Sequence, residues 1–166
     1  SLAQEKETVT VIFSFYMHYG RLESTDPTAN WRLDIWQDVI FDIVKEGRYL
    51  TGYGYNEIFP QMLDPTAPGR LGRDGMNEHV HNYFVNIFSR GGIIQLILFI
   101  IFHYGIIKYW KDNNQNNQIL TYIVPVFVVS FLDITMEGVQ FPFIYYFFLY
   151  YFLKNCTRVK VIELYG

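Results

Sequence analysis

Residues 92–107 read GIIQLILFIIFHYGII, and the predicted fold class follows from this apolar run. Only Gln95 and His103 interrupt its apolar side chains. A helix needs about 20 predominantly apolar residues to cross the hydrocarbon core of a bilayer. With its flanking residues the run approaches this length, and it predicts a membrane-spanning helix over about 91–109.

Two further apolar runs follow. The first covers residues 119–134 and contains Pro125, which a membrane helix tolerates as a kink. The second covers residues 141–153 and is dense in Phe and Tyr. The sequence therefore predicts an all-α membrane protein with about three transmembrane helices, followed by a tail at residues 154–166.

The positions of lysine and arginine predict how these helices are oriented. The connection at residues 108–118 and the segment 154–160 are basic, whereas the turn at 133–140 has neither residue type. Connections rich in Lys and Arg stay in the cytoplasm. We therefore expect a cytoplasmic tail and place residues 1–90 on the extracytoplasmic side of the membrane.

Residues 1–90 are predicted to be a largely helical and irregular loop region. An amphipathic helix over about 31–46 is indicated by apolar side chains at helical spacing, namely Trp36, Val39, Ile40, Ile43 and Val44. Asn30 is its candidate N-cap and Gly47 its stop. Residues 20–30 and 60–75 are predicted to be loops, and the apolar segment 9–17 is either the end of a span or a buried strand.

Composition excludes several classes of function. The chain is 51% hydrophobic and only 17% charged, with a net charge of −3, so it offers no basic surface for a nucleic acid. Its single cysteine, Cys156, excludes an internal disulfide and a cysteine-based zinc site. Ser1 opens directly into polar residues, and we interpret the chain as the C-terminal part of a longer polytopic protein.

The densest group of polar side chains is GRDGMNEHVHN at residues 72–82, just before the first span. In an extended backbone His79 and His81 point to the same face. Three interpretations are open. Glu78 and the two histidines are plausible zinc ligands; the histidines are structural groups at the membrane interface; or one imidazole is a general base that takes a proton from an attacking hydroxyl.

Arginines bear on this choice. Arg32 is expected near a helix N-terminus, on the same face as Trp36, while Arg70 and Arg73 lie in the predicted loop. If these guanidinium groups gather beside His81, they offer forked donors that suit phosphate oxygens. A phosphorylated lipid substrate would fit such a site. The alternative for each loop arginine is solvated surface charge.

The order of these motifs resembles the O-antigen ligase and polymerase superfamily of bacterial membrane glycosyltransferases. The resemblance runs from about Asn30 to Leu153 and is carried by four elements in sequence: Arg32-x-x-x-Trp36, Gly52-Tyr53-Gly54-Tyr55, His79-Val80-His81-Asn82 and Gly92-Ile93-Ile94. One position departs from the family pattern. Gln95 stands where the family often has the second glycine of Gly-x-x-Gly.

The resemblance implies a metal-independent transfer, without cofactor, of an oligosaccharide from undecaprenyl diphosphate to a sugar hydroxyl. His81 would be the general base and Arg32 would bind the diphosphate. The candidate substrate-binding residues are Arg70, Arg73, Glu78, His79, Asn82 and Trp36. The expected setting is the bacterial inner membrane, among membrane lipids, with the site in a periplasmic loop. The acceptor is a lipid A-core in a ligase and a growing glycan in a polymerase, and a protein O-glycosyl ligase is a third member of the group.

Two other classes remain open. A polyprenyl-phosphate phosphatase would also use histidine and arginine outside the cytoplasm, and a transporter or scaffold segment would use the same spans without chemistry. The glycosyltransferase interpretation makes a geometric demand that the scaffold does not: the side chains of Arg32 and His81 must face one cavity near the outer boundary of the membrane.

Overall fold

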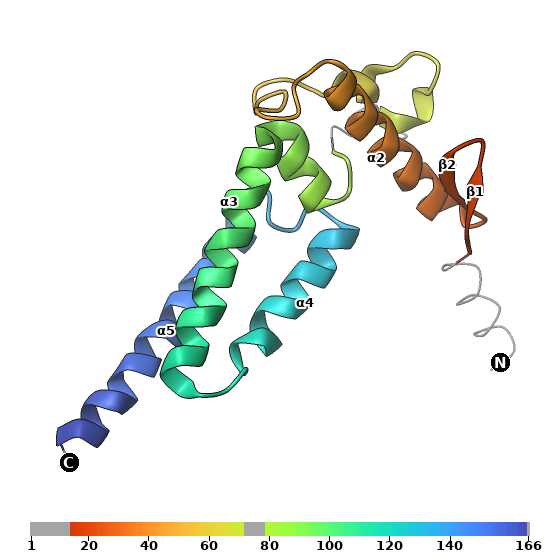
Figure 1. The fold of residues 1–166 in the computed structure, drawn as a ribbon. Coiled ribbons are helices and arrows are strands. Elements are labelled where there is room, and N and C mark those ends of the chain that lie inside the picture. The colour runs from red at the N-terminus through yellow and green to blue at the C-terminus, as the bar shows by residue number, and fades with distance from the viewer. Residues whose placement is uncertain (1–13, 72–78, 166) are drawn as a thin grey trace, which may run out of the picture.

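The computed structural model describes residues 14–71 and 79–165 (Figure 1). The chain is mostly helical, with a small hairpin and an irregular segment leading into three long helices. In order, the elements are β1 (Phe15–His18), β2 (Arg21–Ser24), α2 (Pro27–Lys45), the 3₁₀ helices η1 (Pro60–Leu63) and η2 (Pro68–Leu71), α3 (Tyr83–Asn114), α4 (Ile119–Leu132) and α5 (Gln140–Tyr165).

The hairpin corrects the all-α prediction. Strands β1 and β2 pair antiparallel, with Phe15 opposite Ser24 and His18 opposite Arg21. The tight turn between them places Tyr19 and Gly20 at φ values of 48° and 80°, the left-handed backbone typical of two-residue hairpin loops. The predicted loop at 20–30 was therefore wrong, and β1 is exposed rather than buried.

Helix α2 begins earlier than the spacing of its apolar residues indicated. Its N-cap is Asp26, whose side chain accepts from the backbone N–H of Ala29 at 2.7 Å, so the predicted cap at Asn30 was wrong. Asn30 instead accepts from the backbone N–H of Ser24 at 2.9 Å, which ties the helix to the hairpin. The helix is amphipathic as predicted, and its buried stripe consists of Leu33, Ile35, Val39 and Ile43. Ile40 and Val44, which were predicted to belong to the apolar stripe, are exposed instead.

Helix α3 is broken at Gly92, where φ is 69° and ψ is −171°. The segment at 49–54 fills the break. Tyr53 and Gly54 donate backbone N–H groups to the carbonyls of Ser89 (2.7 Å) and Arg90 (2.9 Å), and Ile93 donates to the carbonyl of Tyr49 (2.8 Å). The loop thus satisfies backbone groups that the broken helix cannot pair within itself.

The long helices have two distinct ends. In Figure 1 the start of α3, the end of α4 and the turn at 133–139 lie at one end, near α2, and the 115–118 connection lies at the other. Among the described residues, α3 is the one helix long and apolar enough to cross a membrane, and α4 is shorter. Three spans therefore stay a prediction. Helix α5 continues through the residues predicted to form a separate tail.

Candidate functional site

His81 lies on the short segment that enters α3, and its backbone is left-handed, with φ at 51°. A residue other than glycine rarely adopts this conformation, and it persists where the surroundings impose it. Here the residues on both sides of His81 are held in place by hydrogen bonds. The indole N–H of Trp36 donates to the carbonyl of the buried Val80, and the side chain of Asn82 caps α3 by accepting from the N–H groups of Phe84 (3.0 Å) and Val85 (3.1 Å).

The turn between α4 and α5 supplies two carboxylates to this segment. The Nδ1 atom of His81 lies 3.7 Å from Oδ1 of Asp133, an ion-pair distance, and Nδ1 of His79 lies 3.4 Å from Oε2 of Glu137. The backbone N–H of Tyr83 also donates to the carbonyl of Asp133 at 3.2 Å. The two histidines therefore face two different acidic side chains.

The turn also reaches the first turns of α3. The side-chain amide of Asn86, which is buried, donates to Oε2 of Glu137 at 3.1 Å. Glu137 thereby connects α3 to the turn after α4. Neither Asp133 nor Glu137 was predicted as a site residue. Their signal in the sequence was modest: two carboxylates, four residues apart, in the turn predicted on the same side of the membrane as the histidines.

Helix α2 lies against the same imidazole: the ring of Trp31 is 5.2 Å from that of His81, and Arg32 is the next residue of the helix. Burial lowers the pKa of His81 below its ordinary value, the positive charge of Arg32 lowers it further, and the charge of Asp133 opposes both. His81 is therefore held neutral at physiological pH, the state that a general base requires.

The guanidinium of Arg32 is available for a ligand. It is partly buried, its Nε atom has no hydrogen-bond partner, and no described carboxylate forms an ion pair with it. A partly buried arginine without a counter-charge favours an anion. That Arg32 and His81 face one cavity stays a prediction.

Arg70, the second predicted arginine, contacts other residues of the fold. It is buried, donates to the carbonyl of Gln61 at 3.1 Å, and forms ion pairs with Asp34 (3.0 Å) and Asp38. On a helix, positions two apart point about 200° away from each other, so Asp34 and Arg32 occupy opposite faces of α2. The printed partners of Arg70 are thus acidic side chains of α2 and a backbone carbonyl, and its predicted role in substrate binding is untested.

The remaining predicted residues divide into two groups. Trp36 and Asn82 hold the backbone on either side of His81, as described above, and His79 lies two residues from it against Glu137. Arg73 and Glu78 lie outside the described residues. With Glu78 undescribed, the zinc interpretation is not tested, although residues 14–71 and 79–154 contain no group of three or more side chains suited to a metal ion.

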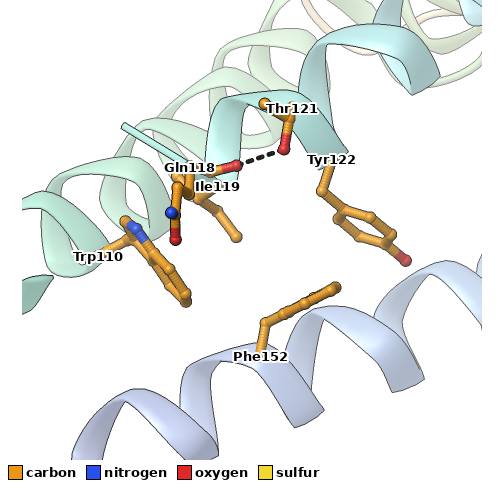
Figure 2. A pocket seen from close by; sticks show the side chains of 6 residues that line it. All are labelled: Trp110, Gln118, Ile119, Thr121, Tyr122 and Phe152. Atoms are coloured by element: carbon orange, nitrogen blue, oxygen red, sulfur yellow. Dashed lines mark hydrogen bonds between the residues drawn. The ribbon is translucent and has the colours of Figure 1, made fainter. Parts of the chain in front are cut away.

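A separate pocket lies at the opposite end of the long helices. Figure 2 shows its lining, which comes from α3, α5 and the start of α4: Trp110, Gln118, Ile119, Thr121, Tyr122 and Phe152. Its volume is about 340 Å³. None of these side chains is a carboxylate, an imidazole or a basic group, so the lining offers no strong base and no charge for a phosphate. It is not the centre formed by Arg32 and His81.

Comparison with known proteins agrees with the motif order. The family model described as O-antigen ligase matches residues 8–100, while no curated protein and no solved structure matches the chain. The matched region includes Arg32 and His81, and it ends before the acidic turn at 133–139. Because the match covers more than half of the chain, the resemblance predicted from the motifs is confirmed, and this chain belongs to the O-antigen ligase family, a membrane-associated family.

Proposed function

We propose that the protein transfers an oligosaccharide from undecaprenyl diphosphate to a sugar hydroxyl at the periplasmic face of a bacterial inner membrane. The observation that carries this proposal is the packing of helix α2 against His81, where the ring of Trp31, the residue before Arg32, lies 5.2 Å from the imidazole. A neutral imidazole beside an unpaired guanidinium combines a proton acceptor with a binding group for a phosphate leaving group.

The reaction follows from these two side chains. The acceptor hydroxyl loses its proton to Nε2 of His81 as its oxygen forms a bond to the anomeric carbon of the donor. The bond between that carbon and the diphosphate oxygen breaks, and the bonding electrons leave with the diphosphate. Arg32 donates hydrogen bonds to the diphosphate oxygens, and these strengthen as negative charge develops there.

Asp133 supports the base in this scheme. Its Oδ1 faces Nδ1 of His81, so the neutral imidazole carries its proton on Nδ1 and leaves Nε2 to accept. The same carboxylate stabilises the imidazolium that forms after proton transfer. Asp133 thus orients His81, the base, toward the acceptor hydroxyl.

The positions of lysine and arginine support the periplasmic location. The turn that supplies Asp133 has no Lys or Arg, and the 108–118 connection at the other end of α3 contains two lysines. This distribution of lysine and arginine supports a location of His81 and its partners outside the cytoplasm. The acceptor is a lipid A-core for a ligase and a growing glycan for a polymerase.

The proposal is tested in cells by replacing His81 with Ala in the full-length protein. We expect surface glycan of normal length to disappear while the abundance of the protein in the membrane is unchanged. Complete loss of capping would identify a ligase, and a single repeat unit on the core would identify a polymerase. Undiminished glycan in the variant would refute the role of His81 as the base.

A further inference from the structure

We propose, resting on the proposed function, that Trp31 is the platform on which the acceptor sugar stacks beside His81. The ring of Trp31 lies 5.2 Å from the ring of His81, centroid to centroid, at an interplanar angle of 50°. Trp31 is partly exposed, so one part of its indole is open to a ligand. An aromatic face of this kind packs against the apolar C–H face of a pyranose.

Position on the helix separates Trp31 from Arg32. Consecutive residues of a helix point about 100° apart, yet Trp31 contacts the imidazole of His81 and Arg32 acts on it electrostatically. The two side chains therefore leave α2 in different directions. A base between donor and acceptor needs this arrangement, with the diphosphate on the Arg32 side and the attacking sugar on the Trp31 side.

Polar groups near the ring fit a sugar as well. The indole N–H of Trp31 has no hydrogen-bond partner within the part of the chain that the structure describes, so it is free to donate to a hydroxyl. The side chain of Asp133 is 55% exposed; its Oδ1 accepts from the N–H of Ile134 at 2.8 Å. Oδ2 has no such bond among the described residues and can accept from a second hydroxyl. An aromatic ring that stacks on the sugar, with a hydrogen-bond donor and a carboxylate beside it, is a typical set of contacts for a carbohydrate.

Trp31 also packs against the core cluster that contains Ile35 and Val39, so a purely structural role must be distinguished from a binding role. If Trp31 only fills the core, Leu leaves a cavity and lowers stability without a specific effect on acceptor affinity. If Trp31 is a stacking platform, Leu also weakens acceptor binding, because Leu has no aromatic face. Trp36 on the same helix has its indole N–H satisfied by Val80, which leaves Trp31 as the tryptophan of α2 with an available donor.

The test uses the full-length protein in proteoliposomes with a polyprenyl-diphosphate-linked oligosaccharide and a titrated glycan acceptor. For Trp31→Leu we expect the acceptor KM to rise about tenfold, a factor that one aromatic stacking contact accounts for. We expect the donor KM to stay within about twofold, and Trp31→Phe to restore most of the acceptor affinity. Trp110→Phe, at the opposite end of the helices, is the matched control and should leave both constants unchanged.

The outcomes separate this inference from the proposed function. An unchanged acceptor KM with a lowered kcat in Trp31→Leu would show that the ring only positions His81, and would overturn the inference while leaving the transfer reaction intact. Equal behaviour of the Leu and Phe variants would overturn it as well. Failure of the unmodified protein to transfer glycan to any sugar acceptor would instead refute the proposed function itself.

Discussion

At the scale of single residues, the state of His81 results from opposing influences. Burial and Arg32 favour the neutral imidazole, and Asp133 favours the charged one. The net pKa lies below the ordinary value of about 6.5. Activity that depends on a neutral base should therefore persist as pH falls to this lowered pKa, and be lost as pH falls through it.

Two substitutions should shift, in opposite directions, the pH at which activity is lost on acidification. Arg32→Gln removes a positive charge, so the pKa of His81 rises and activity is lost at a higher pH. Asp133→Asn removes a negative charge, so the pKa falls and activity extends to a lower pH, at a reduced kcat because the ring loses its orienting partner. The measurement is the pH dependence of kcat/KM, which reports the free enzyme. If kcat/KM falls at the same acidic pH in both variants, the assignment of His81 as the titrating base is wrong.

Some residues of the candidate site could be predicted from the sequence and others could not. The histidine element and Arg32 were predicted from motif order, because both belong to short, recognisable patterns. Asp133 and Glu137 were not, because their contact with the histidines depends on how α4 returns beside α3. Arg70 was grouped with the substrate because a loop arginine carries no sign of its partners, and its ion pairs with Asp34 and Asp38 exist only in the fold.

At the scale of elements, the decisive contact is the one between the 49–54 loop and the break in α3. A Cβ atom added to Gly92 would lie 2.1 Å from the carbonyl of Leu50, and one added to Gly52 would lie 2.4 Å from that of Arg90. Both glycines are therefore required by close backbone approach as well as by positive φ. This gives a physical reason for two of the four elements that carried the resemblance.

A matched pair of substitutions tests this contact. Gly92→Ala should lower the free energy of unfolding by about 3 kcal/mol or more, since the backbone must both strain and separate. Gly47→Ala has a similar φ of 73° but meets nothing within 4 Å, so it should cost only about 1 kcal/mol. Thermal unfolding of the purified protein in detergent measures both. Similar losses in the two variants would show that the close approach contributes nothing.

Element boundaries were predictable where periodicity and length carry the signal. The amphipathic stripe located α2 to within a few residues, and the apolar run located the main body of α3. The hairpin was missed because its strands are four residues each and lack a clear alternation of apolar and polar side chains. The true cap of α2 was missed because Asp26 and Asn30 are both good caps, and the hairpin, by engaging Asn30, leaves Asp26 at the N-cap.

At the scale of the whole molecule, the two ends of the long helices are predicted to face different compartments. Val139, in the turn beside the site, is 82% exposed, and Asn117, in the connection at the other end, is exposed too. In a Cys156→Ser background, Val139→Cys should react with a membrane-impermeant thiol reagent added to spheroplasts. Asn117→Cys should react only after the membrane is opened. Labelling of both from the same side would contradict the predicted topology.

The transfer rate of the purified full-length protein in proteoliposomes tests whether His81 and Arg32 together carry out glycosyl transfer. We predict that His81→Ala lowers the rate from a polyprenyl-diphosphate donor by at least about 100-fold, the usual contribution of a general base. Arg32→Ala should lower it as well, with donor binding weakened. A His81→Ala variant that transfers glycan at the unmodified rate would contradict the account.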